Sequence, residues 1–418
     1  MTIVYFALAI PMFYFVESSI SIGGIGFMYM YLFGIAIIVF AAILFLVFPD
    51  LKRLILSFKY GMVIAAPYLW TVLYSLFFWV ITMAGFTVMR KGVFYVVYQF
   101  IAIAVAAATV YMFGSNGMYY QFFAVAVANV IIMIQTIMEY GFGEFITEYF
   151  SVVTSFSIET GSGMKIFEAL GFSFGIAFFL IYFMLDFKKN KRRIPWFIVG
   201  VLLFFMGLKR IVLAAIVITV LVGLLLFRFA RKHAKGVVYF IASAALVLAF
   251  VYIVAVRLGL YTWLESIGVD SMGRDVIYER IYDIYELGIG YLGRGAGFIT
   301  EAALSGSLDL ALSDGYSVAA IHNDLLRQYI ELGFVGNIIW IVLFLHFRIR
   351  YFFHKSENDM DRRHGILAAA VFFALFITFT TDNTNYYYYT TLFSSMAVMC
   401  FRYDEYAEKI RLPGDEMM

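Results

Sequence analysis

Long apolar runs follow one another along almost the whole chain, and they leave few folds open to it. A helix needs roughly 20 mainly apolar residues to cross the hydrocarbon core of a bilayer, and by that measure about twelve segments are candidates. Lipid cannot satisfy an open strand edge, and the runs lack the alternation of a membrane barrel, so we expect helices. The candidate spans, of which the first is short, are residues 3–16, 25–47, 62–84, 93–113, 121–140, 170–187, 196–207, 211–227, 237–256, 325–347, 366–381 and 386–401.

The composition also indicates an integral membrane protein. The 418 residues are 64% hydrophobic and 14% charged, whereas soluble domains are about 45–50% apolar and about 25% charged. The net charge of +2 leaves no basic field of the kind that binds nucleic acid. The first apolar run starts directly after Thr2 and is followed by many like it, so we expect a first span and not a cleaved signal peptide. The prediction is an all-α, polytopic membrane protein whose residues 1–418 form a single transmembrane domain.

Clusters of Lys and Arg predict the orientation, because short basic loops remain in the cytoplasm. These clusters lie at residues 51–59, 188–193, 228–235 and 348–363. Placing all four inside puts both termini in the cytoplasm. The segment 257–321 then becomes a long extracytoplasmic loop within the transmembrane domain.

The stretch between two of these clusters, residues 196–227, is too long for one comfortable span and only long enough for two short ones. As a helical hairpin it would carry Lys209 and Arg210 at its outer tip, against the positive-inside rule. Ionisable residues at a membrane edge indicate function by default. The alternative is one tilted helix that holds both charges against a carboxylate, which would invert the orientation of everything before it.

The long outer loop begins with a predicted amphipathic helix. Residues 271–287 place apolar side chains on one helical face and charged ones, among them Arg274 and Arg280, around it. Such a helix would lie on the outer surface of the membrane. The alternative is a lid whose charges are simply solvated.

A glycine-rich segment follows in the same loop. Gly293, Arg294, Gly295, Ala296 and Gly297 alternate glycine with other residues. Glycine permits positive φ and lets backbone N–H groups approach a phosphate. Taken alone, this spacing is more typical of a plain turn.

The most specific segment begins at His322. Either Asn323 or Asp324 is a strong candidate for the N-cap of the span that follows. His322 would then stand at the outer mouth of that helix, beside its positive dipole end. Such a position attracts anions, and a histidine there is able to take or give a proton near neutral pH.

The same helix carries an ionisable pair and two glycines. Arg327 and Glu331 are four residues apart on one face, where they can pair with each other or with a substrate. Gly333 and Gly336 thin the helix so that a neighbour can pack closely. Asp382, in another outer loop, could be a second carboxylate partner, although a solvated loop aspartate is the more common situation.

Together these residues resemble a known family, the lipid-linked polysaccharide polymerases and O-antigen ligases, which are bacterial membrane glycosyltransferases of the Wzy and WaaL type. The family signature is an outer-face His-Asn followed by Leu, an acidic residue and Gly-x-x-Gly at the start of a late span. It is matched here by His322, Asn323, Leu326, Glu331, Gly333 and Gly336.

Two further features are similar to the family. Arg274 and the glycine-rich segment look like the start of its periplasmic loop, and Arg210 looks like an arginine that precedes a span rich in small residues. The chain departs from the family where the usual Ser/Thr-Arg-Gly reads Lys209-Arg210-Ile211.

The resemblance implies a GT-C-like fold and a polysaccharide polymerase in the cytoplasmic membrane of a bacterium. Such an enzyme joins oligosaccharide repeat units carried on undecaprenyl diphosphate, at the outer face, with inversion and without metal or other cofactor. The donor, the acceptor and the membrane lipid are the expected partners, with a chain-length regulator protein as a further one. Alternatives are an O-antigen ligase that transfers finished glycan to a lipid A core-type acceptor and, from a different class, a transporter or flippase of lipid-linked sugars.

The resemblance also assigns roles to residues. His322 would be the catalytic base, or position the acceptor, while Arg210 and Arg274 would stabilise the leaving diphosphate. The remaining candidates for substrate binding are Arg280, Asn323, Arg327, Glu331, Gly293, Gly295 and Arg294.

Overall fold

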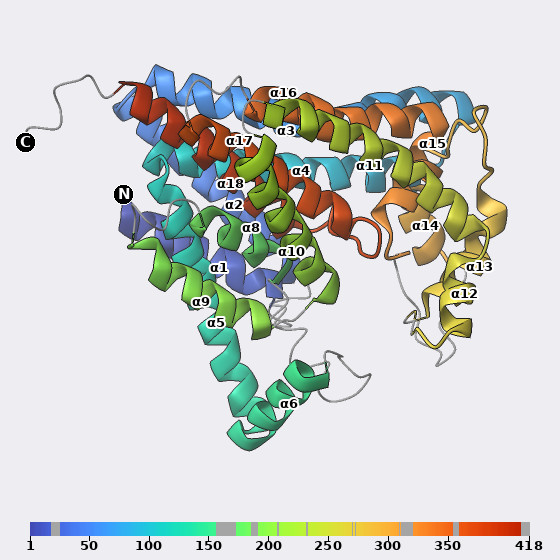
Figure 1. Cartoon of the computed structure of the whole chain (residues 1–418), viewed down its shortest axis with the longest axis horizontal. Helices are drawn as coiled ribbons and strands as arrows, with labels where there is room; N and C mark the ends of the chain where they lie inside the picture. The colour runs from blue at the N-terminus through green and yellow to red at the C-terminus, as the bar shows by residue number, and fades with distance from the viewer. Residues whose placement is uncertain are drawn as a thin grey trace, which may run out of the picture.

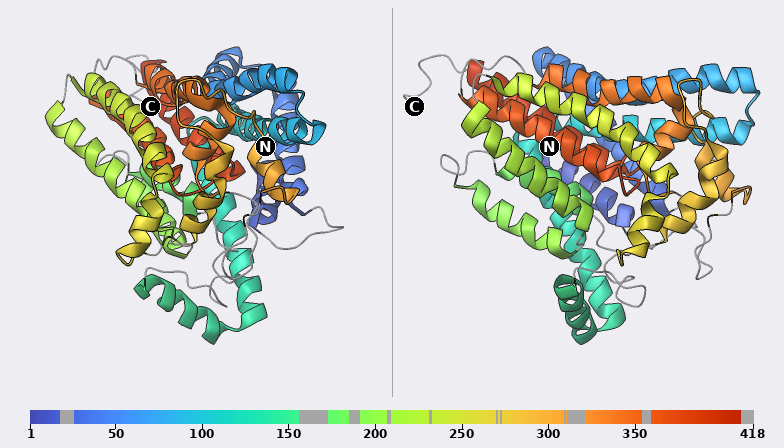
Figure 2. Two further views of the ribbon diagram at one scale, coloured as in Figure 1. Left: turned by 90° about the vertical axis from the view of Figure 1, so that its right-hand side faces the viewer. Right: turned by 45° about the vertical axis from the view of Figure 1, so that its right-hand side comes forward.

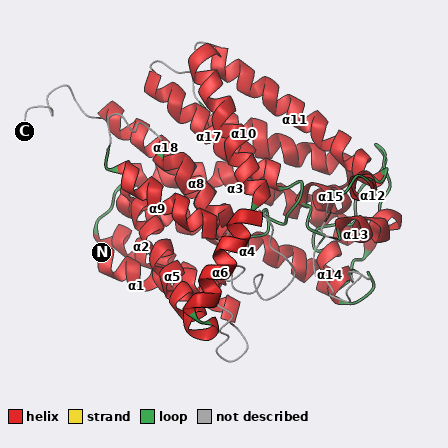
Figure 3. Ribbon diagram, turned by 60° about the horizontal axis from the view of Figure 1, so that its bottom comes forward, coloured by secondary structure: helices red, strands yellow, loops and turns green. Residues whose placement is uncertain are grey.

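The computed structural model describes most of the chain. The described residues are 1–17, 26–155, 173–184, 191–206, 209–230, 233–269, 271, 273–308, 310, 321–353 and 359–410. Every regular element among them is a helix, as Figure 3 shows, so the prediction of an all-α protein is confirmed for this part of the chain. The helices are α1 (Thr2–Glu17), α2 (Gly26–Val47), α3 (Leu51–Thr82), α4 (Phe86–Phe113), α5 (Asn116–Tyr140), α6 (Phe142–Ser155), α8 (Ser173–Phe183), α9 (Arg193–Met206), α10 (Arg210–Leu225), α11 (Ala234–Arg257), α12 (Leu260–Ser266), α13 (Arg274–Ile281), α14 (Phe298–Leu304), α15 (Asp324–Val342), α16 (Arg348–Phe352), α17 (Asp359–Thr378) and α18 (Tyr388–Ile410).

Seven helices of the described part are long and apolar enough to cross a membrane. They include α2, α3, α4, α5, α10, α11 and α15. Three shorter apolar helices, which fall in α1, α8 and α9, accompany them. Each predicted span overlaps a described helix, although the bounds differ and residues 25, 170–172, 185–187 and 207 of the predicted spans lie outside the described residues.

The stretch predicted to be a hairpin contains two helices. Residues 207 and 208, between α9 and α10, lie outside the described residues, and Lys209, which directly precedes α10, has an extended backbone conformation (φ −98°, ψ 108°) and so interrupts the helix. Both helices pack against α8.

The bundle is built around α4 and α18. α18 packs against α4, α8 and α17, and α3 also packs against α4. The peripheral helices instead expose large apolar side chains, such as Leu46 on α2 and Leu221 on α10, which are 79% and 55% exposed. An apolar outer surface of this kind is what a lipid environment favours.

The loop helices gather at one end of the bundle. In Figure 1, α12, α13 and α14 lie on the right, while the N-terminus and the C-terminal part of α18 lie on the left. The right-hand view of Figure 2 shows the same separation, and both views show α6 projecting from the bundle beyond the end of α5. The end that carries α12 to α14 therefore holds most of the polar loop.

The predicted amphipathic helix is shorter than expected and packs differently. α13 ends at Ile281 and continues only as one 3₁₀ turn, Tyr282–Ile284. Its side chains Ile277 and Ile281 are buried in a cluster with apolar side chains of α11, α12 and α15, so the apolar face packs on protein and not on a membrane surface. Leu287, expected on that face, is 40% exposed.

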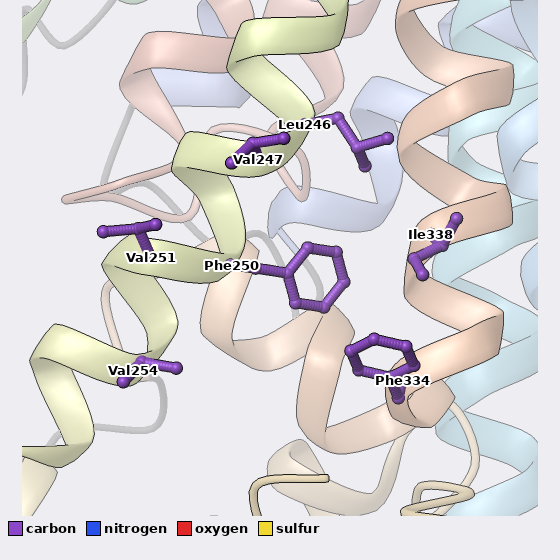
Figure 4. Close-up of a pocket in the computed structure, with 7 residues that line it drawn as sticks. All are labelled: Leu246, Val247, Phe250, Val251, Val254, Phe334 and Ile338. Carbon is purple, nitrogen blue, oxygen red and sulfur yellow. The ribbon is translucent and has the colours of Figure 1, made fainter. Parts of the chain in front are cut away.

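α15 is broken at Gly333. The residue has φ 68° and ψ −173°, which only glycine adopts readily. The N–H of Phe334 donates to the carbonyl of Tyr291 (2.8 Å) and so leaves the helical pattern. In Figure 4 the helical ribbon that carries Ile338 extends only as far as Phe334, where the chain changes direction. The sequence predicted close packing at this glycine, and the structure adds a change of helix direction.

We expect Gly333→Ala to destabilise the protein strongly. A Cβ there would stand 2.3 Å from the carbonyl carbon of Leu292, in a backbone conformation that alanine rarely adopts. The combined strain should lower the free energy of unfolding by about 3 kcal/mol or more. Thermal unfolding of the detergent-purified protein measures this. Gly236→Ala on α11 is the control, because its Cβ would meet nothing within 4 Å. An unchanged melting temperature for Gly333→Ala would contradict the break of α15 at this residue.

Candidate functional site

His322 lies directly before α15 in a strained conformation. Its φ is 48°, the left-handed region that residues with a side chain seldom occupy. The imidazole is 33% exposed, and its Nδ1 lies 3.7 Å from Oδ1 of Asp382. Nδ1 also lies 3.3 Å from Nδ2 of Asn383. Strain of this kind persists only where the surrounding structure holds it, and it clusters at functional sites.

Asn323 caps α15 and ties it to α11. Its Oδ1 accepts the backbone N–H of Leu326 (3.0 Å), so Asn323 and not Asp324 is the N-cap. Its Nδ2 donates to the hydroxyl of Tyr252 on α11 (2.9 Å). Because Asn323 is bonded both to Leu326 and to Tyr252, it fixes the backbone position of the adjacent His322.

The loop between α17 and α18 is hydrogen-bonded to the start of α15. The backbone N–H of Asp324 donates to the carbonyl of Asp382 (3.2 Å), and that of Leu325 to the carbonyl of Phe379 (3.2 Å). The Asp324 carboxylate in turn accepts the N–H of Asn385 (2.6 Å). These bonds bring Asp382 beside His322.

Asp382 is buried beside His322, Asn383 and Tyr387 and is not a solvated loop aspartate. Its side chain is 15% exposed, and Oδ1 accepts the N–H of Asn383 (2.8 Å) and the hydroxyl of Tyr387 (3.0 Å). Burial would raise the pKa of Asp382, but the hydrogen bonding and charge of His322, together with the charge of Lys209 and the Asn383 N–H, hold that pKa below its usual value. A carboxylate that stays ionised can orient a histidine, as in hydrolase triads.

Arg274 approaches the same loop from α13. Its guanidinium donates to the carbonyl of Thr381 (2.9 Å), the residue before Asp382, and to that of Ser271 (3.0 Å). Arg274 therefore adds a positive charge close to Asp382.

Lys209, directly before α10, contributes a further positive charge to the surroundings of Asp382. The charge of Lys209 is one of the influences that lower the pKa of Asp382, and its Nζ lies 6.0 Å from the ring of Phe174. Arg210, the first residue of α10, is exposed and makes no hydrogen bond or ion pair with any described residue. Lys209, and not the arginine that the sequence favoured, is therefore among the charges that lower the pKa of Asp382.

Arg327 and Glu331 pair with each other inside the protein. Arg327 Nε lies 3.4 Å from Glu331 Oε1, and the two side chains are 4% and 0% exposed. The guanidinium stacks on the ring of Tyr386, 3.5 Å from its centroid, and donates to the hydroxyl of Thr300. Glu331 also accepts from Tyr386 (3.3 Å) and from the N–H of Ile299 (3.3 Å). The sequence allowed Arg327 and Glu331 to pair with each other or with a substrate, and in the structure they pair with each other.

The glycine-rich segment is a packing turn in this structure. Its three glycines have φ between 82° and 92°, and the backbone N–H groups of Arg294, Gly295 and Ala296 all donate to protein acceptors. The acceptors are the Ile330 carbonyl (3.0 Å), the Glu331 carbonyl (2.8 Å) and Ser75 Oγ (2.9 Å). These groups are therefore engaged, which favours the turn over a phosphate cradle. A Cβ at Gly293 would stand 2.5 Å from the N of Gly333.

The two remaining arginines are exposed. Arg294 donates through Nε to the carbonyl of Ile284 (3.3 Å), and Arg280 lies at the end of α13. Their roles in binding remain predictions.

Sequence reasoning gave too little weight to Asp382 and overlooked Tyr252 and Tyr387. Two of the four consecutive tyrosines Tyr386–Tyr389, namely Tyr386 and Tyr387, donate hydrogen bonds to carboxylates inside the protein. The adjacent polar run Thr380–Asn385 was the available signal, because polar residues between two apolar spans need partners when they are buried.

The fold and its apolar surface define an α-helical membrane protein with a polar group at one end of the bundle. Comparison with known proteins finds no family model and no curated protein that matches this chain. Among the described residues, no three His, Cys, Asp or Glu side chains lie together so that they could hold a metal ion.

Proposed function

We propose that this protein is a glycosyltransferase of the outer face of the bacterial cytoplasmic membrane, and specifically a polymerase of oligosaccharide repeat units carried on undecaprenyl diphosphate. The observation that carries the proposal is the partly exposed His322–Asp382 pair, in which Arg274 donates to the residue before Asp382 and the charge of Lys209 helps to lower the pKa of Asp382. A base next to fixed cations is what transfer from a lipid diphosphate requires. The matches to the Wzy and WaaL signature in the sequence support the same reading.

The chemistry follows from this arrangement. For Nε2 to accept a proton, Nδ1 must carry its hydrogen toward Asp382, so the Asn383 amide does not donate to Nδ1 in the reacting state. A sugar hydroxyl of the acceptor loses its proton to Nε2 and attacks the anomeric carbon of the donor. The bond from that carbon to the diphosphate breaks, and undecaprenyl diphosphate leaves with the electron pair. Lys209 and Arg274 stabilise the negative charge of the leaving group.

The proposal includes twelve spans, a GT-C-like fold and both termini in the cytoplasm. The arrangement of the helices supports this orientation, because the N-terminus and the C-terminal part of α18 lie at the end opposite to α12, α13 and α14 (Figure 1). The basic start of α3 and the Arg-containing α16 carry the charges expected inside.

We expect Lys209→Cys to react with a membrane-impermeant maleimide in intact cells. The reason is that Lys209 would lie at the outer tip of the α9–α10 hairpin, and the native cysteine, Cys400, is buried and gives little background. Lys52→Cys, at the exposed start of α3, is the matched control and should react only after the membrane is permeabilised. Labelling of position 209 only after permeabilisation would reverse the proposed orientation.

Two other functions are also compatible with the His322–Asp382 pair and its neighbouring cations. An O-antigen ligase would use the same base and cations with a different acceptor, and the described residues do not favour either enzyme. A transporter of lipid-linked sugars would place its polar residues near the bilayer midplane between broken helices. The break in α15 has that character, but the exposed polar group lies at the loop end of the bundle.

Reconstitution decides among these functions. The purified protein is placed in vesicles with a lipid-linked repeat unit, without added metal, and the products are separated on a gel. We expect a ladder of many lengths. Transfer that appears only when a second acceptor is supplied would indicate a ligase. Movement of the lipid-linked sugar between leaflets without any transfer would indicate a transporter and contradict the proposal.

A further inference from the structure

The hydroxyl of Tyr252 on α11 lies between the two segments that carry His322 and Asp382. It donates to the carbonyl of Thr380, in the loop before α18. It also accepts from Nδ2 of Asn323, the residue after His322 (2.9 Å). One side chain of α11 therefore joins the start of α15 to the loop between α17 and α18.

Hydrogen bonds occupy every position of this hydroxyl. A phenol has one hydrogen to donate and an oxygen that accepts. Because the hydrogen of Tyr252 goes to the Thr380 carbonyl, the hydroxyl of Tyr261 on α12, 3.0 Å away, is a donor to Tyr252. The Tyr252 oxygen thus accepts from both Tyr261 and Asn323. Loss of the hydroxyl would leave each of these groups without a partner, which gives the two segments freedom to move apart.

The bridge made by Tyr252 stands next to the contact on which the proposed mechanism depends. Asn323 directly follows His322, and Thr380 precedes Asp382 by two residues. Nδ1 of His322 lies 3.7 Å from Oδ1 of Asp382 and 3.3 Å from Nδ2 of Asn383. The carboxylate accepts a hydrogen from Nδ1, whereas the amide donates one to it. The position of this loop therefore decides which imidazole nitrogen carries the hydrogen.

We propose that Tyr252 is a positioning residue that holds Asp382 within reach of His322, so that Nδ1 carries the hydrogen and Nε2 is free to accept a proton. The kinetic consequence of this inference rests on the proposed function, whereas the geometry rests on the hydrogen bonds of Tyr252 alone. A misplacement of about 1 Å in a reacting group can lower a rate about a hundredfold. Loss of the Tyr252 hydroxyl should therefore act on the rate and not on substrate binding.

The kinetic test compares two substitutions on α11. Tyr252→Phe keeps the ring and removes only the hydroxyl, and it should lower kcat about tenfold while the KM for the lipid-linked donor stays unchanged. Tyr239→Phe is the control, because it makes the same change near the other end of α11, where the hydroxyl has no hydrogen bond to a described residue. It should alter neither constant. An unchanged kcat in Tyr252→Phe, or a loss explained by its melting curve, would overturn the inference.

A double variant separates positioning from a purely structural role. If Tyr252 acts through Asp382, its hydroxyl no longer matters once that carboxylate is gone. Adding Tyr252→Phe to Asp382→Asn should then lower kcat by less than about twofold, because coupled residues are not additive in free energy. Independent contributions would instead multiply the two losses, and that result would overturn the inference.

A spectroscopic measurement separates this inference from the proposed function. Solid-state NMR of the protein with ¹⁵N-labelled histidine, in vesicles, distinguishes the two positions of the imidazole hydrogen, and the signals of His322 are those lost in His322→Asn. Tyr252→Phe should raise the fraction of His322 with its hydrogen on Nε2, and Tyr239→Phe should not. An unchanged fraction would overturn the inference. The expected change, found in a protein whose unmodified form transfers no sugar, would sustain the inference and contradict the transferase.

Discussion

Replacing His322 should remove glycosyl transfer while leaving the protein folded. Loss of a positioned general base typically costs a factor of about 10²–10⁴ in rate. Because His322 has φ 48°, the informative variant is His322→Asn, since asparagine tolerates the left-handed region and the backbone need not change. We expect polymer formation by reconstituted His322→Asn to fall by that factor, with its melting temperature close to that of the unmodified protein.

The neighbours of His322 provide the controls. Asp382→Asn should also lower the rate, because the carboxylate that orients the imidazole is lost, but less than His322→Asn does. Tyr387→Phe removes one hydrogen bond to Asp382 and should have the smallest effect. Full activity in His322→Asn would refute the assignment of the base. A variant that is inactive because it has unfolded would show itself in the melting curve.

The second large effect concerns the buried pair of Arg327 and Glu331. Removing one member of a buried ion pair commonly costs about 3–5 kcal/mol, because the partner is left as an uncompensated charge. Arg327→Met and Glu331→Gln should therefore each lower the melting temperature markedly in detergent. The double variant Arg327→Met/Glu331→Gln should regain much of the loss, since it leaves no lone charge.

The double variant also separates a structural pair from a substrate site. If Arg327 and Glu331 contacted the substrate, each single variant would keep its melting temperature and lose activity, and the double variant would be inactive. The structure leads us to expect the opposite pattern, because both side chains are almost fully buried and already bonded to Tyr386. Thermal unfolding and transfer assays on the same three preparations make the comparison.

Local patterns in the sequence predicted a large part of this arrangement. The helices followed from the length of the apolar runs, and the two helices α9 and α10 from the length between two basic clusters. The cap at Asn323 was one of two candidates, and the pairing of Arg327 with Glu331 was one of two alternatives, because each depends on residues three or four apart in one helix. The length of α13 and the contacts of its apolar face were wrong, since the face that periodicity assigned to a membrane surface packs on α11 and α15.

The composition of the site depended on contacts between distant segments. Asp382 is sixty residues from His322 (382 − 322 = 60) and reaches it only because the start of α15 bonds to the loop before α18. Lys209 acts on Asp382 from a third segment, and Tyr252 holds Asn323 from a fourth. The sequence by itself determined which stretches are helical and apolar, because partition into lipid and hydrogen bonding within a helix act on neighbouring residues. Only the tertiary structure decided which polar side chains meet, because that depends on how the helices pack and on the change of direction at Gly333, where a Cβ would collide with the loop that crosses it.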